Sequence, residues 1–339
     1  MGMTLVSPRA GRATGCWHSV RVQRWDDLAD VEPGFGPSVV TIGNFDGVHR
    51  GHAAVLGEVV ELARGRGLSS AAVTFDPHPL QVLNPERAPG LLTGLAHRLD
   101  LLQATGLDAV LVMPFTRELA GWSPERFVEE VFVDGLHAAV VVVGHDVRFG
   151  KANSGDLATM QDLGERLGFE VVVLADLGDQ GEPSRWSSTA VREALAAGDV
   201  DRAGAILGHR HRVSSTVVHG DHRGRELGYP TANLDTVHAA GLVPADGVYA
   251  GWLTRANGDR LPAAVSIGTN PTFDGVRRQL EAFCLDQESG LDLYGERVDL
   301  DFVAHLRPTL RFEGVEALVH QMERDVATCR EILLGEARR

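Results

Sequence analysis

Lysine is almost absent from this sequence. Lys and Arg together number 32, and Lys151 is the only lysine among them. A Walker phosphate loop needs Gly-Lys followed by Ser or Thr, and Ala152 follows Lys151, so this loop is excluded. A lysine nucleophile or Schiff base has a single candidate. Phosphate chemistry would therefore have to use backbone amides, histidine, arginine and a metal ion.

Cysteine and long apolar runs are also scarce. Cys16, Cys284 and Cys329 are widely spaced and form neither a disulfide framework nor a zinc pattern, which favours a reducing cytoplasm. The longest apolar run, residues 138–143, is far shorter than the roughly 20 residues that span a bilayer, so no membrane association is expected. Residues 1–20 lack the apolar core of a secretory signal and are expected to form a disordered leader, the alternative being a start codon assigned too far upstream.

Basic charge is in deficit as well. The 46 acidic residues outnumber the 32 basic ones and leave a formal net charge of −14. Proteins that bind nucleic-acid backbones normally carry a basic face, so no nucleic-acid partner is expected. The hydrophobic content of 44% is typical of a soluble globular protein. The length of 339 residues predicts about two domains.

The first two hundred residues alternate strand-like and helix-like segments. The short apolar segments are residues 38–43, 69–75, 108–115, 137–144 and 170–177. Between the first two, residues 52–67 place Val55, Val59 and Leu62 on one helical face. Continuous apolar strands joined by helices predict a parallel sheet covered on both faces. Ligands of such sheets bind at the carboxyl ends of the strands.

The pattern changes after about residue 207. Strand-like segments follow one another at residues 211–219, 247–254, 261–268, 279–286 and 297–306. Turn-rich pieces without helical periodicity separate them, which predicts an antiparallel barrel. Residues 312–334 predict an amphipathic helix packed on that barrel, with apolar positions at Val315, Leu318, Met322, Val326 and Cys329. We therefore expect a leader at 1–20 and domains at 21–207 and 208–339.

The string GNFDGVHRGH, residues 43–52, lies between the first predicted strand and its helix. A helix N-terminus presents free amides and a positive dipole end to an anion. His49 and His52 stand three residues apart, so both rings can face one phosphate and donate hydrogen bonds to it. The alternative is that they are two surface histidines at a helix cap.

This motif resembles the H-x-G-H motif of the nucleotidylyltransferase superfamily. The longer string is similar to the N-terminal module of the prokaryotic bifunctional riboflavin kinase/FMN adenylyltransferase (FAD synthetase) family. TFDPHP (residues 74–79), VVGHDVRFGKANSGD (142–156) and WSSTAVR (186–192) resemble further motifs of that family in its order. Val147 and Trp186 depart from the family's usual Phe and Ile, and both are hydrophobic exchanges beside the polar positions.

The resemblance implies transfer of AMP from ATP to the phosphate of FMN, with release of pyrophosphate. No covalent enzyme intermediate is needed, so catalysis is positioning and charge stabilisation. His49 and His52 would stabilise the phosphates. The other implied ATP and phosphate contacts are Gly43, Asn44, Asp46, Gly51, Ser187, Ser188, Thr189 and Arg192, and the flavin side is Asp146 and Arg148. Asp76 and His78 either contact the ligand or belong to a strand end made rigid by Pro77 and Pro79. Lys151 lies either near the ATP phosphates or in a solvated loop.

The second motif is HGDHRGRELGYPTANL, residues 219–234. Its glycines and arginines can wrap phosphates, although the glycines alone also suit a polar hairpin loop. Thr231 and Asn233 project to the same side of an extended chain and offer oxygen ligands suited to Mg²⁺.

RGRELGYPTANL resembles the riboflavin kinase module of the same family, and residues 244–252, 265–273, 279–286 and 291–298 follow in the family's order. The implied fold is an α/β parallel-sheet nucleotidylyltransferase (Rossmann-like) domain followed by an antiparallel β-barrel riboflavin kinase domain with a C-terminal helix. The implied ATP loop is Gly220, Arg223, Gly224, Arg225 and Gly228, and the implied metal ligands are Thr231 and Asn233. Glu281 would be the general base. The strand pattern alone favours its pointing to solvent, whereas the resemblance favours its being held inward.

We therefore expect a cytoplasmic enzyme that converts riboflavin to FMN and FMN to FAD, with ATP as co-substrate and Mg²⁺ as cofactor. One alternative is a single-activity enzyme, and another is a transferase for a different acceptor, such as nicotinamide mononucleotide or phosphopantetheine. A third is a non-catalytic flavin sensor. The polar motif positions present in both halves, including His52 and Glu281, argue against the first and third, and the kinase-like barrel argues against the second. The oligomeric state is left open.

Overall fold

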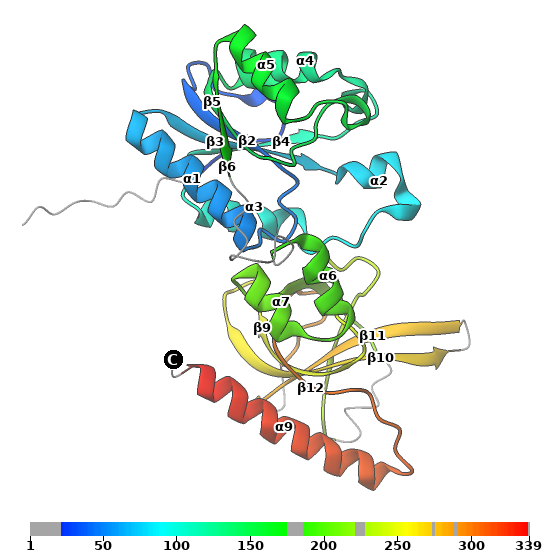
Figure 1. The fold of residues 1–339 in the computed structure, drawn as a ribbon. Coiled ribbons are helices and arrows are strands. Elements are labelled where there is room, and N and C mark those ends of the chain that lie inside the picture. Colours follow the sequence, from blue (N-terminus) through cyan, green and yellow to red (C-terminus); the bar gives the residue numbers. More distant parts are fainter. Residues whose placement is uncertain (1–21, 175–185, 221–227, 273–274, 288–290, 338–339) are drawn as a thin grey trace, which may run out of the picture.

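The computed structural model describes residues 22–174, 186–220, 228–272, 275–287 and 291–337. Figure 1 shows a sheet layered between helices at one end of the molecule and a barrel at the other. Within the described residues, none of the helices combines the length and apolarity that a bilayer crossing demands.

The first layered unit is a six-stranded sheet. Its strands are β1 (Gln23–Trp25), β2 (Ser38–Ile42), β3 (Ser69–Asp76), β4 (Ala109–Pro114), β5 (Ala138–Gly144) and β6 (Glu170–Leu174). Their order is β1-β4-β3-β2-β5-β6, and every neighbouring pair is parallel. The predicted parallel sheet is confirmed. The edge strand β1 was not expected, because three residues are too few to show a periodic pattern.

Helices cover both faces of this sheet. One face packs against α1 (Arg50–Arg66) and α3 (Leu95–Ala104), and the other packs against α4 (Pro124–Phe127), the helical turns of Val128–Gly135, and α5 (Leu157–Leu167). In α1 the buried positions are Leu56, Val59, Val60 and Ala63, so the buried face is rotated from the predicted stripe. A short helix, α2 (Pro79–Leu83), follows β3.

The second unit is a closed barrel. Its strands are β7 (Arg212–Val218), β8 (Ala232–Leu234), β9 (Gly247–Thr254), β10 (Arg260–Thr272), β11 (Gly275–Cys284) and β12 (Arg297–Arg307). The order around the barrel is β10-β11-β8-β7-β12-β9, with antiparallel neighbours. The predicted antiparallel barrel is confirmed, and β8 comes from the extended segment around Asn233.

The C-terminal helix α9 (Val315–Ala337) lies on the outside of the barrel (Figure 1). Cys329 and Leu333 are fully buried and pack with Ala250 and Leu285, so the predicted helix is confirmed. Val315 is 61% exposed, and the apolar face therefore begins later in the helix than predicted.

Two helices lie between the sheet and the barrel: α6 (Ser188–Ala196) and α7 (Val200–Leu207) (Figure 1). Leu195 and Leu207 belong to the same hydrophobic core as Val213 and Tyr249 of the barrel. The predicted limit between residues 207 and 208 falls inside this core. That limit stays a prediction, while the packing joins α6 and α7 to the barrel.

Candidate active sites

The H-x-G-H turn connects β2 to α1. His49 is the N-cap of α1, and its Nδ1 accepts a hydrogen bond from the backbone N–H of His52 at 3.3 Å. The rings of His49 and His52 stack with centroids 3.7 Å apart. A Cβ on Gly51 would lie 3.2 Å from both the His49 ring and the carbonyl oxygen of Trp186, so the glycine permits this close packing. The structure thus brings the two predicted histidines together.

Burial controls the charge of both rings. It lowers the pKa of His49 to about 4. The pKa of His52 is well below its ordinary value, chiefly because of burial and secondly because of His49. Both rings are therefore neutral at pH 7, and each can donate one hydrogen bond. Within the described residues, His52 Nδ1 is buried without a hydrogen-bond partner. His49 is buried, which does not fit a pair of surface histidines.

Asp46 holds the turn to distant segments. Its buried carboxylate accepts hydrogen bonds from the backbone N–H groups of Leu92, at 2.9 Å, and Thr93, at 3.1 Å. The guanidinium of Arg192 forms an ion pair with the same carboxylate, and Ser188 Oγ donates to the carbonyl oxygen of Asp46. Asp46 therefore fixes the shape of the turn, and its contact with ATP stays a prediction. The predicted phosphate clamp therefore lies directly against the H-x-G-H turn.

The remaining predicted residues of this site surround the carboxyl ends of β2 and β5, which are neighbouring parallel strands. Gly43 and the exposed Asn44 follow β2, and the exposed Asp146 and Arg148 follow β5. The carboxyl ends of neighbouring parallel strands meet at one edge of a sheet. The residues predicted to contact ATP and those predicted to contact flavin therefore lie at the same edge.

The WSSTAVR motif forms the start of α6. Ser187 is the N-cap, and its hydroxyl accepts from the backbone N–H of Ala190 at 3.1 Å. Thr189 is exposed in the first turn, and Arg192 lies one turn in. These residues therefore form a capped helix start, and their contact with ATP stays a prediction.

Arg98 supports the site from beneath, and sequence reasoning missed it. Its side chain is 2% exposed, and it donates to the carbonyl oxygens of Asn44, at 3.2 Å, and Phe75, at 2.9 Å. The Asp76 carboxylate lies 3.6 Å away, and burial lowers the pKa of the Arg98 guanidinium. One buried cation thus fixes the ends of β2 and β3. A single arginine in an amphipathic helix normally lies in solvent, so no sequence signal marked it.

His78 in the TFDPHP segment has a local structural role. Its Nδ1 accepts from the backbone N–H of Leu80 at 3.2 Å, and Gln81 Oε1 accepts from the His78 N–H at 3.1 Å, which caps α2. Burial lowers the pKa of His78. Asp76 is partly exposed at the end of β3. The rigid strand end is present, and direct ligand contact by either residue stays a prediction.

The candidate kinase site lies on the outer face of the barrel. Glu281 on β11 is directly opposite Asn233 on β8. Its neighbours Leu280 and Ala282 face the core, so the period of two places Glu281 outward, where it is half-buried. The expectation that Glu281 is held inward was therefore wrong. A Cβ on Gly220 would collide with the Asn233 amide, so the predicted ATP loop begins against the predicted metal ligand.

A cavity of about 670 Å³ lies beside this strand pair, a size that suits a small-molecule ligand. Gly228, Thr231 and Phe283 line it, and so does Tyr294, whose ring stacks on His219 with centroids 4.1 Å apart. Arg223, Gly224 and Arg225 lie outside the described residues.

The donors predicted for Mg²⁺ are a hydroxyl and an amide oxygen. Thr231 and Asn233 are two residues apart at the start of β8 and so share one side of the strand. Mg²⁺ commonly takes few protein ligands and completes its shell with phosphate and water, so this pair fits the ion beside a nucleotide. Within the described ranges, no group of three or more His, Cys, Asp or Glu side chains forms a metal site.

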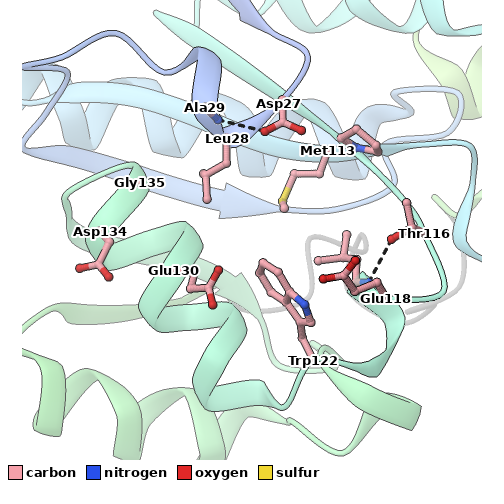
Figure 2. Close-up of a pocket in the computed structure, with 12 residues that line it drawn as sticks. Asp27, Leu28, Ala29, Met113, Thr116, Glu118, Trp122, Glu130, Asp134 and Gly135 are labelled. Carbon is pink, nitrogen blue, oxygen red and sulfur yellow. Dashed lines mark hydrogen bonds between the residues drawn. The ribbon is translucent and has the colours of Figure 1, made fainter.

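A second cavity, of about 700 Å³, opens at the end of β4 (Figure 2). Leu28, Met113 and Trp122 form its apolar lining. Its carboxylates are Asp27, Glu118, Glu130 and Asp134. Four carboxylates disfavour phosphate groups, and none of the predicted site residues is among those that line it.

These two centres define a two-module protein that handles nucleotides, with one site at the carboxyl ends of parallel strands and the other on a closed barrel. The FAD synthetase family matches residues 33–190, and the riboflavin kinase family matches residues 207–333. The chain belongs to the bifunctional riboflavin kinase/FMN adenylyltransferase family.

The similarity extends over nearly the whole length of known members. The bifunctional riboflavin kinase/FMN adenylyltransferase of Escherichia coli K12 is 39% identical over 293 residues, which cover 86% of this chain and 92% of that protein. Its counterpart from Pseudomonas fluorescens is 38% identical over 313 residues, covering 92% and 98%.

A solved structure from Streptococcus pneumoniae, described as a macrolide-efflux protein, has the same fold. Its TM-score is 0.80, with 29% identity over 91% of this chain and 98% of that one. Macrolide efflux is a different activity from that of the sequence relatives, so the match supports the two-module architecture alone.

Proposed function

We propose that this chain phosphorylates riboflavin to FMN with one ATP and adenylylates FMN with a second ATP, yielding FAD and pyrophosphate. The observation that carries the proposal is the presence of two assembled polar centres in one chain. The first is the stacked, neutral His49–His52 pair at the start of α1. The second is Glu281 directly opposite Asn233 on the barrel.

In the kinase step, the Glu281 carboxylate accepts the proton of the ribityl 5′-hydroxyl as its oxygen attacks the γ-phosphorus of ATP. The new O–P bond forms as the bond from the γ-phosphorus to the β-phosphate oxygen breaks, and ADP leaves. Thr231 and Asn233 would hold Mg²⁺, which would supply positive charge to neutralise charge that develops on the phosphates. The cavity beside them receives the substrates.

In the adenylyl-transfer step, a phosphate oxygen of FMN attacks the α-phosphorus of the second ATP, and pyrophosphate leaves. The neutral rings of His49 and His52 and the amides at the start of α1 donate hydrogen bonds to the phosphate oxygens. Ser188 and Arg192 place a hydroxyl and a guanidinium beside the same turn. Neutral donors suit this task because the rings exchange no proton with substrate.

The decisive test is to incubate the full chain with riboflavin, ATP and Mg²⁺ and to separate the flavins by chromatography. We expect FMN to form first and FAD to follow. Absence of both products would refute the proposal, and FMN without FAD would support the single-activity alternative.

Replacing FMN by nicotinamide mononucleotide or phosphopantetheine tests the other acceptors. Omitting Mg²⁺, or replacing Asn233 by Ala, tests the metal assignment, and cell fractionation tests the predicted cytoplasmic location.

A further inference from the structure

The H-x-G-H turn is contacted by a histidine from the segment that enters the barrel. His209 follows Gly208, the C-cap of α7. Its Nε2 lies 2.9 Å from the carbonyl oxygen of Gly47, and its Nδ1 lies 2.9 Å from the carbonyl oxygen of Arg210. Carbonyl oxygens only accept hydrogen bonds, so the ring is the donor, and a neutral ring carries one N–H to donate. In the tautomer protonated at Nε2 that N–H points at the Gly47 carbonyl.

The acceptor belongs to the most constrained peptide of the turn. Gly47 has φ +85°, and the next residue, Val48, has φ +38°, in the left-handed region that β-branched residues avoid. Such a conformation is strained and persists only where the surroundings determine it. The peptide between these residues carries the carbonyl that faces His209, and the catalytic His49 follows at once.

Packing also surrounds Gly47. A Cβ on it would lie 2.9 Å from Leu92 Cδ1 and 3.1 Å from Leu207 Cδ2, and its own N–H donates to Thr93 Oγ1 at 3.2 Å. The peptide is therefore held on one side by the segment that precedes α3 and on the other by the end of α7. His209 adds the hydrogen bond to the carbonyl, which sets the direction of the peptide plane.

The position of His209 is set by the barrel side of the molecule. Leu207, two residues earlier, shares a hydrophobic core with Val213 and Tyr249. The donor ring is thus anchored to the barrel core, while the acceptor is part of the adenylyltransferase turn. The His209 ring also meets the ring of His97 on α3 edge to face, with centroids 5.9 Å apart.

We propose that His209 is a positioning residue for adenylyl transfer, one that holds the Gly47 carbonyl and thereby aims His49 and His52 at the phosphates of ATP. The inference rests on the adenylyl transfer proposed above. His209 acts through the turn and contacts no substrate. Because the histidines act on charge that develops in the transition state, losing this support should lower kcat more than it raises KM for ATP.

The test compares three variants of the full chain. His209→Ala removes the ring and its hydrogen bond to the Gly47 carbonyl, His209→Asn places an amide near the Nδ1 position only, and His209→Gln places its amide near the Nε2 position. FAD formation from supplied FMN and FMN formation from riboflavin are measured separately, together with thermal unfolding. His320→Ala is the matched control, because that side chain on α9 is 73% exposed.

We expect Ala and Asn to lower kcat for FAD formation by about tenfold to a hundredfold, because misplacement by about 1 Å can cost that much. We expect Gln to recover activity to within a few-fold, and the kinase rate to stay unchanged in all three. Retention of FAD formation in His209→Ala, equal loss of both activities, or failure of Gln to recover would overturn the proposal. If the unaltered chain itself formed FMN but no FAD, the proposed function would fail instead.

Discussion

The two candidate centres differ in how their residues are held. The adenylyltransferase turn is fixed by Thr93, Arg192 and His209, whose partners in the turn lie 47, 146 and 162 positions earlier in the sequence. In the kinase site, Glu281 and Asn233 lie on paired strands of one barrel. The first centre should therefore respond to substitutions in several segments, and the second mainly to substitutions on its own strands.

The largest expected effect on a reaction rate comes from a substitution in the candidate kinase site on the barrel. Glu281→Gln keeps the side-chain shape but removes the base, so FMN formation should fall by about 10²- to 10⁴-fold. FAD formation from supplied FMN should be unchanged, because the other centre does not use this carboxylate. Steady-state rates of both reactions are the measurement, with Glu316→Gln on the exposed start of α9 as control. Loss of both activities would contradict the separation of the centres.

The converse variant is His52→Ala. It removes a donor from the H-x-G-H turn, and FAD formation should fall by about 10²- to 10³-fold, the range seen when one transition-state donor is lost. FMN formation should persist. Because His52 is partly buried, His52→Asn is measured beside it, and circular dichroism establishes that both variants are folded. An unchanged rate of FAD formation in both His52 variants would show that His52 has no catalytic role.

Arg192→Met tests the dependence of the turn on a distant segment. The variant leaves the buried Asp46 carboxylate without its guanidinium, and the free energy of unfolding should fall by about 3–5 kcal/mol. FAD formation should fall as well, while FMN formation should persist at temperatures where the protein is folded. The double variant Arg192→Met with Asp46→Asn should recover part of the stability. If it does not, the pair does not act as one unit.

Acidification should affect the two centres unequally. Burial lowers the pKa of His49, His97 and His211 to about 4, and the pKa of His52 is also well below its ordinary value. Between about pH 6.5 and pH 4 the unfolded chain binds protons that the folded chain does not, so stability is lost as the pH falls. The slope approaches about 1.4 kcal/mol per pH unit for each such histidine.

These histidines lie at the turn or at its junction with the barrel, so FAD formation should decline before FMN formation as the pH falls from 7 to 5. Urea unfolding and both rates, measured across this range, are the check. His320→Ala should leave the pH dependence unchanged, since that side chain is exposed. An earlier decline of the kinase would contradict the assignment.

The smallest expected effect concerns the single lysine. Lys151 is exposed in a short helical turn after β5. Lys151→Arg retains the charge, so both rates should stay within about twofold if the side chain is only solvated. A large loss of FAD formation would instead show that a compact ammonium group is required near the phosphates.

Periodicity and local motifs were sufficient for much of this structure. The alternating segments predicted the parallel sheet, and the closely spaced strands predicted the barrel. These features depend on contacts within a few residues, so they can be read along the chain. The outward direction of Glu281 could also have been read from its neighbours, but the resemblance favoured the opposite.

What the sequence determined by itself is the two-module architecture and the family, and it predicted the polar residues of each centre. Only the tertiary structure showed that α6 and α7 share the barrel core, that Arg98 is buried beneath two strand ends, and that His209 faces Gly47. These contacts join segments far apart in the chain, and their donors are an arginine and a histidine that have no distinguishing local pattern. Their burial results from the packing of separate elements, which periodicity within one element does not report.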